Sequence, residues 1–137
     1  MKNIYLDNAA TTQIREAVIN RMQDALSNYY GNPSSTHAYG RSAKTVVESA
    51  RKTIAKQLNA QPSEIIFTSG GTEADNMIIK SAVRDLGVRT IITSKIEHHA
   101  VLHTAEGLIK ECGIAIEFID LDDRGNPKLG HLNLLLL

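Results

Sequence analysis

The spacing of apolar residues predicts two helices in the first part of the chain. From about Gln13, apolar side chains recur every three or four positions, which is the spacing of one helix face. The residues of this face are Ile14, Ala17, Val18, Met22, Ala25 and Leu26. Gly31-Asn32-Pro33 ends this helix. A second, longer helix is predicted to run to about Asn59, with Ser34, Ser35 or Thr36 as its N-cap.

Short apolar runs then alternate with helical patterns. The runs predict strands at 64–68, 90–93 and 114–119, and helices are predicted between them at about 72–86 and 98–112. The helix at 72–86 is apolar nearly all round, so we expect it to be deeply buried. The βαβαβ order predicts an α/β fold with a mainly parallel sheet that helices cover on both faces.

The last residues form an apolar run that follows a polar turn at 122–127. The segment GHLNLLLL at 130–137 has the pattern of a helix that begins but carries no stop signal. Its leucines would leave apolar surface exposed unless another segment covers them. We therefore expect this chain to be part of a longer polypeptide or one piece of a two-piece assembly.

Composition narrows the classes of partner. Fifteen Lys and Arg balance fifteen Asp and Glu, so the chain lacks the positive field that nucleic acids or anionic membranes attract. No stretch reaches the ~18 apolar residues that a membrane-spanning helix needs. The single cysteine, Cys112, cannot form an internal disulfide, which fits a reducing compartment. We expect a cytoplasmic protein that binds neither nucleic acid nor membrane.

The loop after the first predicted strand carries candidate chemistry, because parallel sheets bind ligands beyond the carboxyl ends of their strands. In TSGGT at 68–72, two glycines let a ligand approach the backbone, and the N–H groups at a helix start have no partner. The hydroxyls of Ser69 and Thr72 add donors, so the loop predicts a phosphate site. The alternative is an ordinary tight turn with Thr72 as N-cap. The loop matches neither the dinucleotide fingerprint nor a Walker loop.

The loop after the second predicted strand places two imidazoles at a helix start. His98 is a candidate for stacking on a bound ring or for acid–base chemistry. His99 and His103, four positions apart, are a candidate metal pair, although no third ligand stands at a recognisable spacing. All three histidines are otherwise solvated residues of a helix start, and these alternatives remain open.

Four motifs follow one another in order along the chain. They are YLDNAATT at 5–12, GNPSSTH at 31–37 followed by Gly40-Arg41, IFTSGGTEADN at 66–76 and EHHAV at 97–101. Together they resemble the amino-terminal third of cysteine desulfurases, which are pyridoxal-phosphate enzymes of the class V aminotransferase type. The resemblance covers essentially the whole chain and is strongest for the desulfurases of iron–sulfur cluster assembly.

The resemblance implies a fold and a division of the chain. It implies the fold type I of pyridoxal-phosphate-dependent transferases: a large α/β domain, a smaller domain built from both chain ends, and a homodimer. Residues 1–12 are then an amino-terminal arm near the active site, 13–60 a helical segment, and 61–137 the first part of the large cofactor-binding domain.

The resemblance also implies roles for individual residues. Gly71 and Thr72 match the positions that hold the cofactor phosphate, and His98 matches the histidine that stacks on the cofactor ring and assists proton transfer. The positions near the substrate are Asn8, Ala9 and Ala10. The positions of a loop near the active site and the dimer contact are Asn32, Pro33, Ser34, Ser35 and His37. No residue is assigned to a metal.

Other groups of the family's chemistry lie beyond residue 137 in the resembled enzymes. These are the lysine that attaches the cofactor, the carboxylate at its ring nitrogen, the sulfur-accepting cysteine and the arginine for the substrate carboxylate. Lys95 and Cys112 do not occupy those positions, and we expect Cys112 to be a packing residue at a helix end.

The implied complete enzyme converts L-cysteine to L-alanine and a protein-bound persulfide. The sulfur then passes to an iron–sulfur scaffold or another acceptor protein. Two alternatives remain at this point: another class V enzyme, such as a selenocysteine lyase or an aminotransferase, and a non-catalytic binding or scaffold fragment.

Residues 1–137 by themselves are predicted to be inactive, because in the resembled enzymes the lysine that attaches the cofactor lies beyond this segment. The purified segment, supplied with pyridoxal phosphate, should show no absorption band of a lysine-linked cofactor. It should also release no alanine from L-cysteine, and release above that of a heated sample would contradict the prediction.

Overall fold

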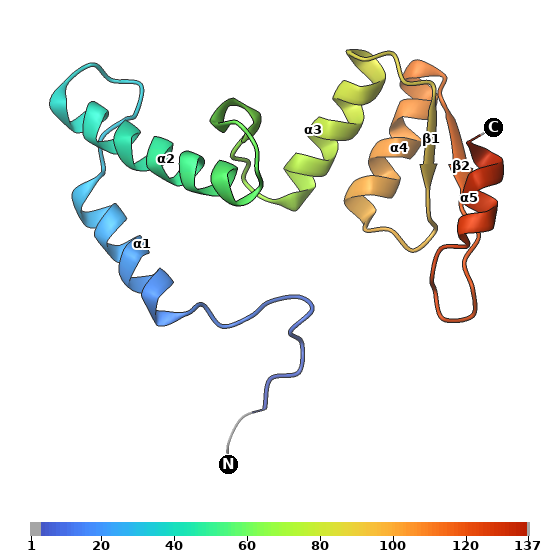
Figure 1. Cartoon of the computed structure of the whole chain (residues 1–137), viewed down its shortest axis with the longest axis horizontal. Helices are drawn as coiled ribbons and strands as arrows, with labels where there is room; N and C mark the ends of the chain where they lie inside the picture. Colours follow the sequence, from blue (N-terminus) through green and yellow to red (C-terminus); the bar gives the residue numbers. More distant parts are fainter. Residues whose placement is uncertain (1–3, 137) are drawn as a thin grey trace. The chain divides into compact units, whose positions relative to one another are not determined.

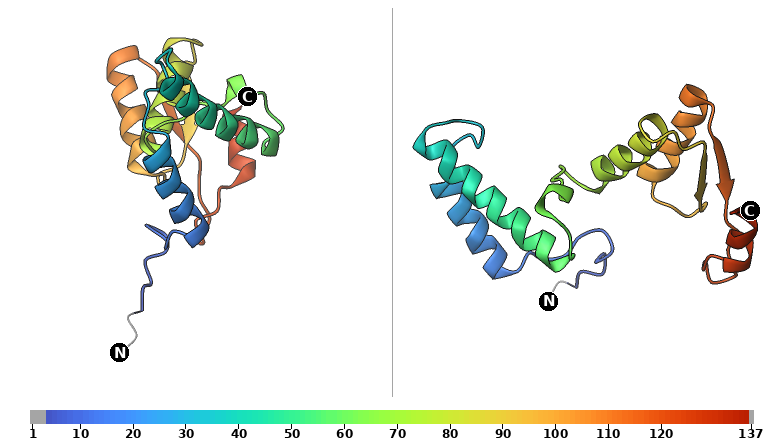
Figure 2. Two further views of the ribbon diagram at one scale, coloured as in Figure 1. Left: turned by 90° about the vertical axis from the view of Figure 1, so that its left-hand side faces the viewer. Right: turned by 45° about the horizontal axis from the view of Figure 1, so that its top comes forward.

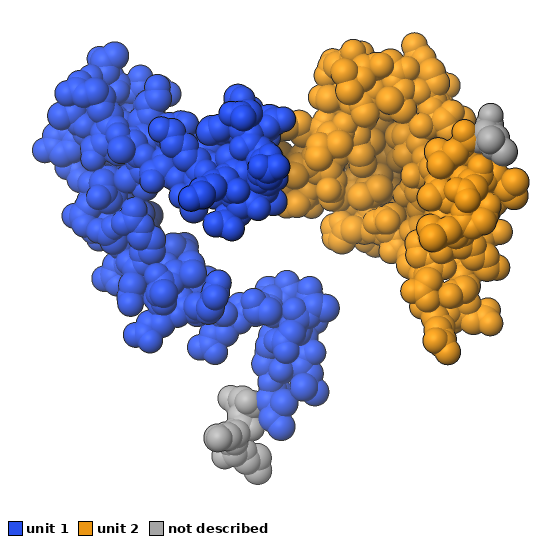
Figure 3. Space-filling view, viewed as in Figure 1, with its two compact units in different colours: residues 1–66 blue, residues 67–137 orange. Residues whose placement is uncertain are grey.

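The computed structural model describes residues 4–136, and the contacts within it form two compact units. Unit 1 comprises residues 1–66 and unit 2 comprises residues 67–137, as Figure 3 shows in blue and orange. Each unit is described by itself. The segment boundaries predicted after residues 12 and 60 remain predictions.

Unit 1 is helical, as its apolar spacing predicts. It contains α1 (Glu16–Asn28), α2 (Ala38–Gln57) and the short 3₁₀ helix η1 (Pro62–Glu64) (Figure 1). Side chains of α1 and α2 line a common cavity of about 480 Å³, so the two helices are neighbours. The helix predicted from Gln13 begins three residues later, at Glu16.

The N-cap predicted for the second helix is wrong. His37 caps α2, because its Nδ1 accepts the N–H of Gly40 at 3.3 Å. The predicted cap positions belong to a turn that precedes the helix. In that turn the Asn32 side chain accepts the N–H of Ser34, and the Asn32 carbonyl accepts the N–H of Ser35, both at 2.9 Å.

Two glycines allow this turn to pack closely on the start of α2. A Cβ at Gly31 would lie within 3.0 Å of the Tyr39 carbonyl, and one at Gly40 would lie within 3.0 Å of the Ser35 carbonyl. Because backbone atoms cannot give way as a flexible side chain can, only glycine fits at either position. The contacts hold the loop that the resemblance assigned to the active-site region.

Unit 2 is the α/β part of the chain. Its elements are α3 (Gly71–Arg84), β1 (Thr90–Thr93), α4 (His99–Cys112), β2 (Ala115–Phe118) and α5 (Leu129–Leu135), and Figure 2 gives two further views of them. β1 and β2 pair in parallel, with Thr90 opposite Ala115 and Thr93 opposite Phe118. The predicted parallel α/β arrangement is confirmed for these elements, and their bounds lie within one or two residues of the predicted ones.

The strand predicted at 64–68 is wrong. η1 takes Glu64, whose carboxylate accepts the N–H of Gln61 at 2.6 Å, and no strand is formed from 65 to 68. The backbone of Ile65 is extended, with φ −97° and ψ 119°. A strand requires hydrogen bonds to a neighbouring strand. In the part of the chain that the structure describes, the sheet consists of β1 and β2 and does not include residues 65–68.

The core of unit 2 is small and aliphatic. Val83, Leu108 and Ile114 are buried, and Ile79, Ile91 and Cys112 pack against them. Cys112 is the last residue of α4 and a packing residue, as predicted.

The predicted deep burial of the helix at 72–86 is wrong, because Val83 is the only buried residue of α3. Ile78 stays 68% exposed, since α3 meets α4 along one side only. The predicted cover of both sheet faces is also wrong for β2, where Ala115 and Glu117 are exposed while Ile116 and Phe118 are half-buried. Within residues 4–136, no helix combines the length and apolar character needed to span a bilayer.

The polar turn after β2 forms as predicted. The Asp122 carboxylate accepts the N–H groups of Arg124 and Asn126, at 2.9 and 2.8 Å, and Gly125 supplies the positive φ of 82°. Hydrogen bonds from the side chain and then the backbone of Asn126 lower the pKa of Asp122. The turn returns the chain towards β2, where His131 of α5 accepts the N–H of Asp120 at 2.9 Å.

Leu108→Ala should destabilise unit 2 by about 2–5 kcal/mol, because Leu108 is only 1% exposed and the smaller side chain would leave a cavity. The matched control is Leu86→Ala, since Leu86 is 80% exposed and its loss should cost within about 0.5 kcal/mol. Urea unfolding of residues 1–137, followed by far-UV circular dichroism, measures both. Equal losses for the two variants would contradict the assigned core.

Candidate functional site

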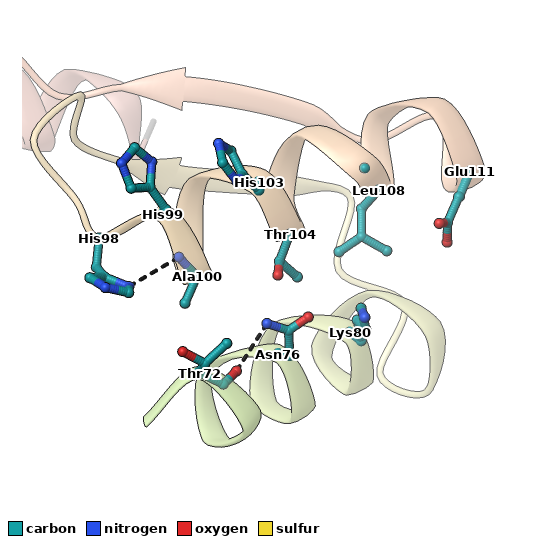
Figure 4. A pocket seen from close by; sticks show the side chains of 11 residues that line it. Thr72, Asn76, Lys80, His98, His99, Ala100, His103, Thr104, Leu108 and Glu111 are labelled. Atoms are coloured by element: carbon teal, nitrogen blue, oxygen red, sulfur yellow. Dashed lines mark hydrogen bonds between the residues drawn. The ribbon is translucent and has the colours of Figure 1, made fainter. Parts of the chain in front are cut away.

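A cavity of about 500 Å³ lies in unit 2 between α3 and α4 (Figure 4). The side chains from α3 stand one helical turn apart; they are Thr72, Asn76 and Lys80. The residues from α4 and its N-cap are His98, His99, Ala100, His103, Thr104, Gly107, Leu108 and Glu111. Thr72 and His98 lie at the same end of the cavity, where both helices begin.

The turn that leads into α3 leaves backbone donors open. Gly70 is the N-cap, and the backbone bond that begins the helix runs from the Ala74 N–H to the Gly70 carbonyl at 3.1 Å. The N–H groups of Gly71, Thr72 and Glu73 therefore have no acceptor inside the helix. The interpretation of Thr72 as N-cap is wrong, because Thr72 is the second residue of α3.

Space surrounds this turn. A Cβ at Gly70 or Gly71 would meet nothing within 4 Å, in contrast to the crowded glycines of unit 1. The glycine backbone is exposed, and the Thr72 side chain lines the adjoining cavity. An anion can thus approach the open N–H groups, which also carry the positive end of the helix dipole.

The side chain of Glu73 binds a donor at the start of the turn. Its carboxylate accepts the N–H of Ser69 at 2.6 Å. This bond, and after it a bond from the Ser69 hydroxyl, lowers the pKa of Glu73. Ser69, which the sequence suggested as a phosphate donor, is therefore tied to Glu73 through its backbone N–H. Thr72 supplies the side-chain donor that faces the cavity.

His98 closes the start of α4. Its Nδ1 accepts the N–H of Ala100 at 3.1 Å, so the proton of the neutral imidazole lies on Nε2. The ring is exposed and borders the cavity, where Nε2 is the nitrogen left to interact with a ligand. His98 thus caps α4 with Nδ1 and leaves Nε2 for a ligand.

The next two histidines stack on each other. The rings of His99 and His103 have centroids 4.9 Å apart and planes inclined by 30°. Within residues 4–136, no group of three or more His, Cys, Asp or Glu side chains is arranged to hold a metal ion. The sequence-based assignment of no metal residue stays a prediction.

The remaining predicted positions lie in unit 1. Asn8, Ala9 and Ala10 form an exposed turn in which the Asp7 carbonyl accepts the N–H groups of Ala10 and Thr11, both at 3.2 Å. The loop from Asn32 to His37 forms the turn before α2 described above. The structure brings Thr72 and His98 to one cavity. The unit 1 positions are described only within unit 1.

Sequence reasoning missed Asn76 and Lys80 as lining residues. Asn76 donates its side-chain N–H to the Thr72 carbonyl at 2.9 Å and so braces the start of α3 (Figure 4). The signal was present in the sequence, because residues four apart share one face of a helix. This shared face was overlooked because the helix at 72–86 was predicted to be a buried packing element.

Comparison with known proteins adds independent information. The aminotransferase class-V family matches residues 4–136. A protein from Bacillus subtilis (strain 168) named IscS 1 is 51% identical over 128 residues, which are 91% of this chain and 33% of that protein. A protein from Dictyoglomus turgidum named cysteine desulfurase IscS is 45% identical over 126 residues, which are 90% of this chain and 32% of that protein.

Solved structures share the arrangement. One named NifS-like protein superposes with a TM-score of 0.87 at 41% identity, covering 93% of this chain and 35% of its own. The chain therefore spans about a third of the length of the curated relatives and of the solved structure that it matches.

Proposed function

This chain belongs to the aminotransferase class-V family, and we propose that it is the amino-terminal segment of a cysteine desulfurase that uses pyridoxal phosphate. One observation carries the proposal: Thr72 and His98, which the family motifs assign to the cofactor, line one cavity. The name of the Dictyoglomus turgidum relative supports the activity. Because that relative is about three times as long, the activity of the complete protein is part of the proposal.

The residues present fit the phosphate group of the cofactor. Gly71, Thr72 and Glu73 offer N–H groups without an intrahelical acceptor, and the space around Gly70 and Gly71 is open. The Thr72 hydroxyl adds a donor at the cavity wall. Charge-assisted hydrogen bonds of this kind, together with the helix dipole, favour a doubly charged phosphate.

His98 is proposed to contact the cofactor ring and to move a proton at its Nε2. Pyridoxal phosphate supplies an electron sink for bonds at the substrate Cα when it is bound. The cap bond at Nδ1 orients the imidazole, which lines the cavity, and leaves Nε2 as the nitrogen that can meet a ligand. This orientation is what a group that exchanges protons with a bound substrate requires.

The proposed substrate is L-cysteine. In the complete enzyme its C–S bond breaks, L-alanine is released, and the sulfur stays on an enzyme thiol as a persulfide for an acceptor protein such as an iron–sulfur scaffold. Asn8, Ala9 and Ala10 are proposed to lie near the substrate. Asn32, Pro33, Ser34, Ser35 and His37 are proposed to lie near the active site and the contact of a homodimer.

The proposal locates the enzyme in the cytoplasm. The bacterial origin of the two relatives supports this location, and so does the single, packing cysteine of this segment.

Thr72→Ala should weaken the binding of pyridoxal phosphate, because it removes a hydrogen bond to a charged acceptor worth about 1.5–3 kcal/mol. Thr72→Ser keeps the hydroxyl and should bind nearly as tightly as the original residue. The complete enzyme for this test carries residues 1–137 in their own full-length polypeptide or joined to the remaining two thirds of the Bacillus subtilis relative. Absorbance titration of the cofactor-free enzyme measures both affinities, and unchanged affinity in Thr72→Ala would refute the phosphate assignment.

His98→Ala should lower turnover of L-cysteine by the complete enzyme by ~10²–10⁴-fold, the usual range for losing acid–base assistance. His98→Gln keeps some bulk without the imidazole ring, so the two variants should differ more in cofactor binding than in lost turnover. His99→Ala is the matched control and should retain activity. Alanine release under saturating cysteine gives the rates. Activity that survived His98→Ala and collapsed in His99→Ala would show that the role belongs to the neighbouring histidine.

A further inference from the structure

The carboxylate of Glu73 closes the turn that precedes α3. Ser69 and Gly70 precede the helix, Gly71 and Thr72 are its first two residues, and Glu73 reaches back across them to the N–H of Ser69 at 2.6 Å. We propose that Glu73 is the positioning residue of the phosphate turn, which holds Ser69 so that the N–H groups of Gly71 and Thr72 converge on one anion. This proposal rests on the proposed function and names a residue that sets the affinity of its phosphate site.

The glycines of the turn have no side chains that could fix the conformation of its backbone. The N-cap Gly70 has no side chain with which to cap the helix, and a Cβ at Gly70 or Gly71 would touch nothing within 4 Å. Glycine also has the largest conformational freedom to lose when a turn becomes ordered. Side-chain bonds from the flanking residues must therefore supply the order.

Two of these bonds act on Ser69 and Gly70, the residues that directly precede α3. The Thr68 hydroxyl donates to the Gly70 carbonyl at 3.1 Å, and the Glu73 carboxylate accepts from Ser69. The Glu73 bond is the shorter one and involves a charged acceptor, so it is the stronger of the two. It also spans the whole turn, whereas the bond from Thr68 spans two residues.

The charge of Glu73 acts in the opposite sense to its hydrogen bond. A carboxylate in the first turn of a helix is stabilised by the helix dipole, but it stands beside the position where a phosphate would bind. The bond arranges the donors, while the negative charge repels the incoming anion. The affinity of the site for phosphate is therefore a balance between the two effects, and different substitutions separate them.

Glu73→Ala removes both the bond and the charge, and Glu73→Gln keeps an acceptor oxygen without the charge. The measured quantity is the ratio of the dissociation constants of pyridoxal and pyridoxal phosphate for the complete, cofactor-free enzyme. This ratio isolates the contribution of the phosphate group. A general loss of stability would weaken the binding of both ligands equally and leave the ratio of their dissociation constants unchanged.

Glu73→Ala should lower this ratio about three- to tenfold, the effect of one intramolecular hydrogen bond. Glu73→Gln should keep the ratio closer to its original value than Glu73→Ala does, because a neutral acceptor restores a weaker bond without the repulsion. Glu106→Ala is the matched control, since Glu106 is an exposed glutamate of α4 outside the cavity, and it should leave the ratio unchanged.

Two results would overturn the proposal. An unchanged ratio in Glu73→Ala would make Glu73 an ordinary helix-start residue. Equal losses in the Ala and Gln variants would mean that the charge itself is required.

Thr72→Ala separates failure of this proposal from failure of the proposed function: if it also leaves the ratio unchanged, the turn does not bind the phosphate at all. A Glu73→Ala protein that fails to fold binds neither ligand, and the Gln variant then decides the outcome.

Discussion

The return of the chain through β1 is the constraint on which the site depends. β1 follows α3 and runs back along unit 2 before α4 begins, so both helices begin at the same end of unit 2 (Figure 1). The pairing of β1 with β2 fixes the position of that strand, and the contact of α3 with α4 fixes the two helices beside each other. Thr72 and His98 consequently reach one cavity although 25 residues separate them in the sequence.

The sequence predicted the local parts of this arrangement well. The run Thr90–Thr93 is β-branched on all four positions, and its bounds as a strand were predicted correctly because nothing competes with that preference. The turn at Asp122 was predicted for a similar reason, since its carboxylate and Gly125 act within five residues. The prediction of a phosphate site at the glycine turn rests on the same kind of short-range rule.

The failures all concern interactions that depend on a partner. Residues 65–68 have the composition of a strand, but pairing is a property of two segments and cannot be read from one. The apolar residues of α3 indicate burial, yet Ile78 stays exposed because burial requires a neighbour on that side. Both helix caps that were missed, at Gly70 and His37, arise from backbone geometry that the preceding turn decides. The bond from Ser69 to Glu73 was missed for the same reason.

The open N–H groups of the two helix starts at the cavity have different partners, and this difference fits the roles proposed for the two starts. At α4 the imidazole of His98 accepts the N–H of Ala100, so that helix start is already capped. At α3 the cap is a glycine, and the carboxylate of Glu73 turns away from the helix donors to hold Ser69. An anion therefore finds more open donors at α3 than at α4. If the phosphate of the proposed cofactor bound at α3, Thr72 would help to hold it, and His98 would be available to the attached ring because it lines the same cavity.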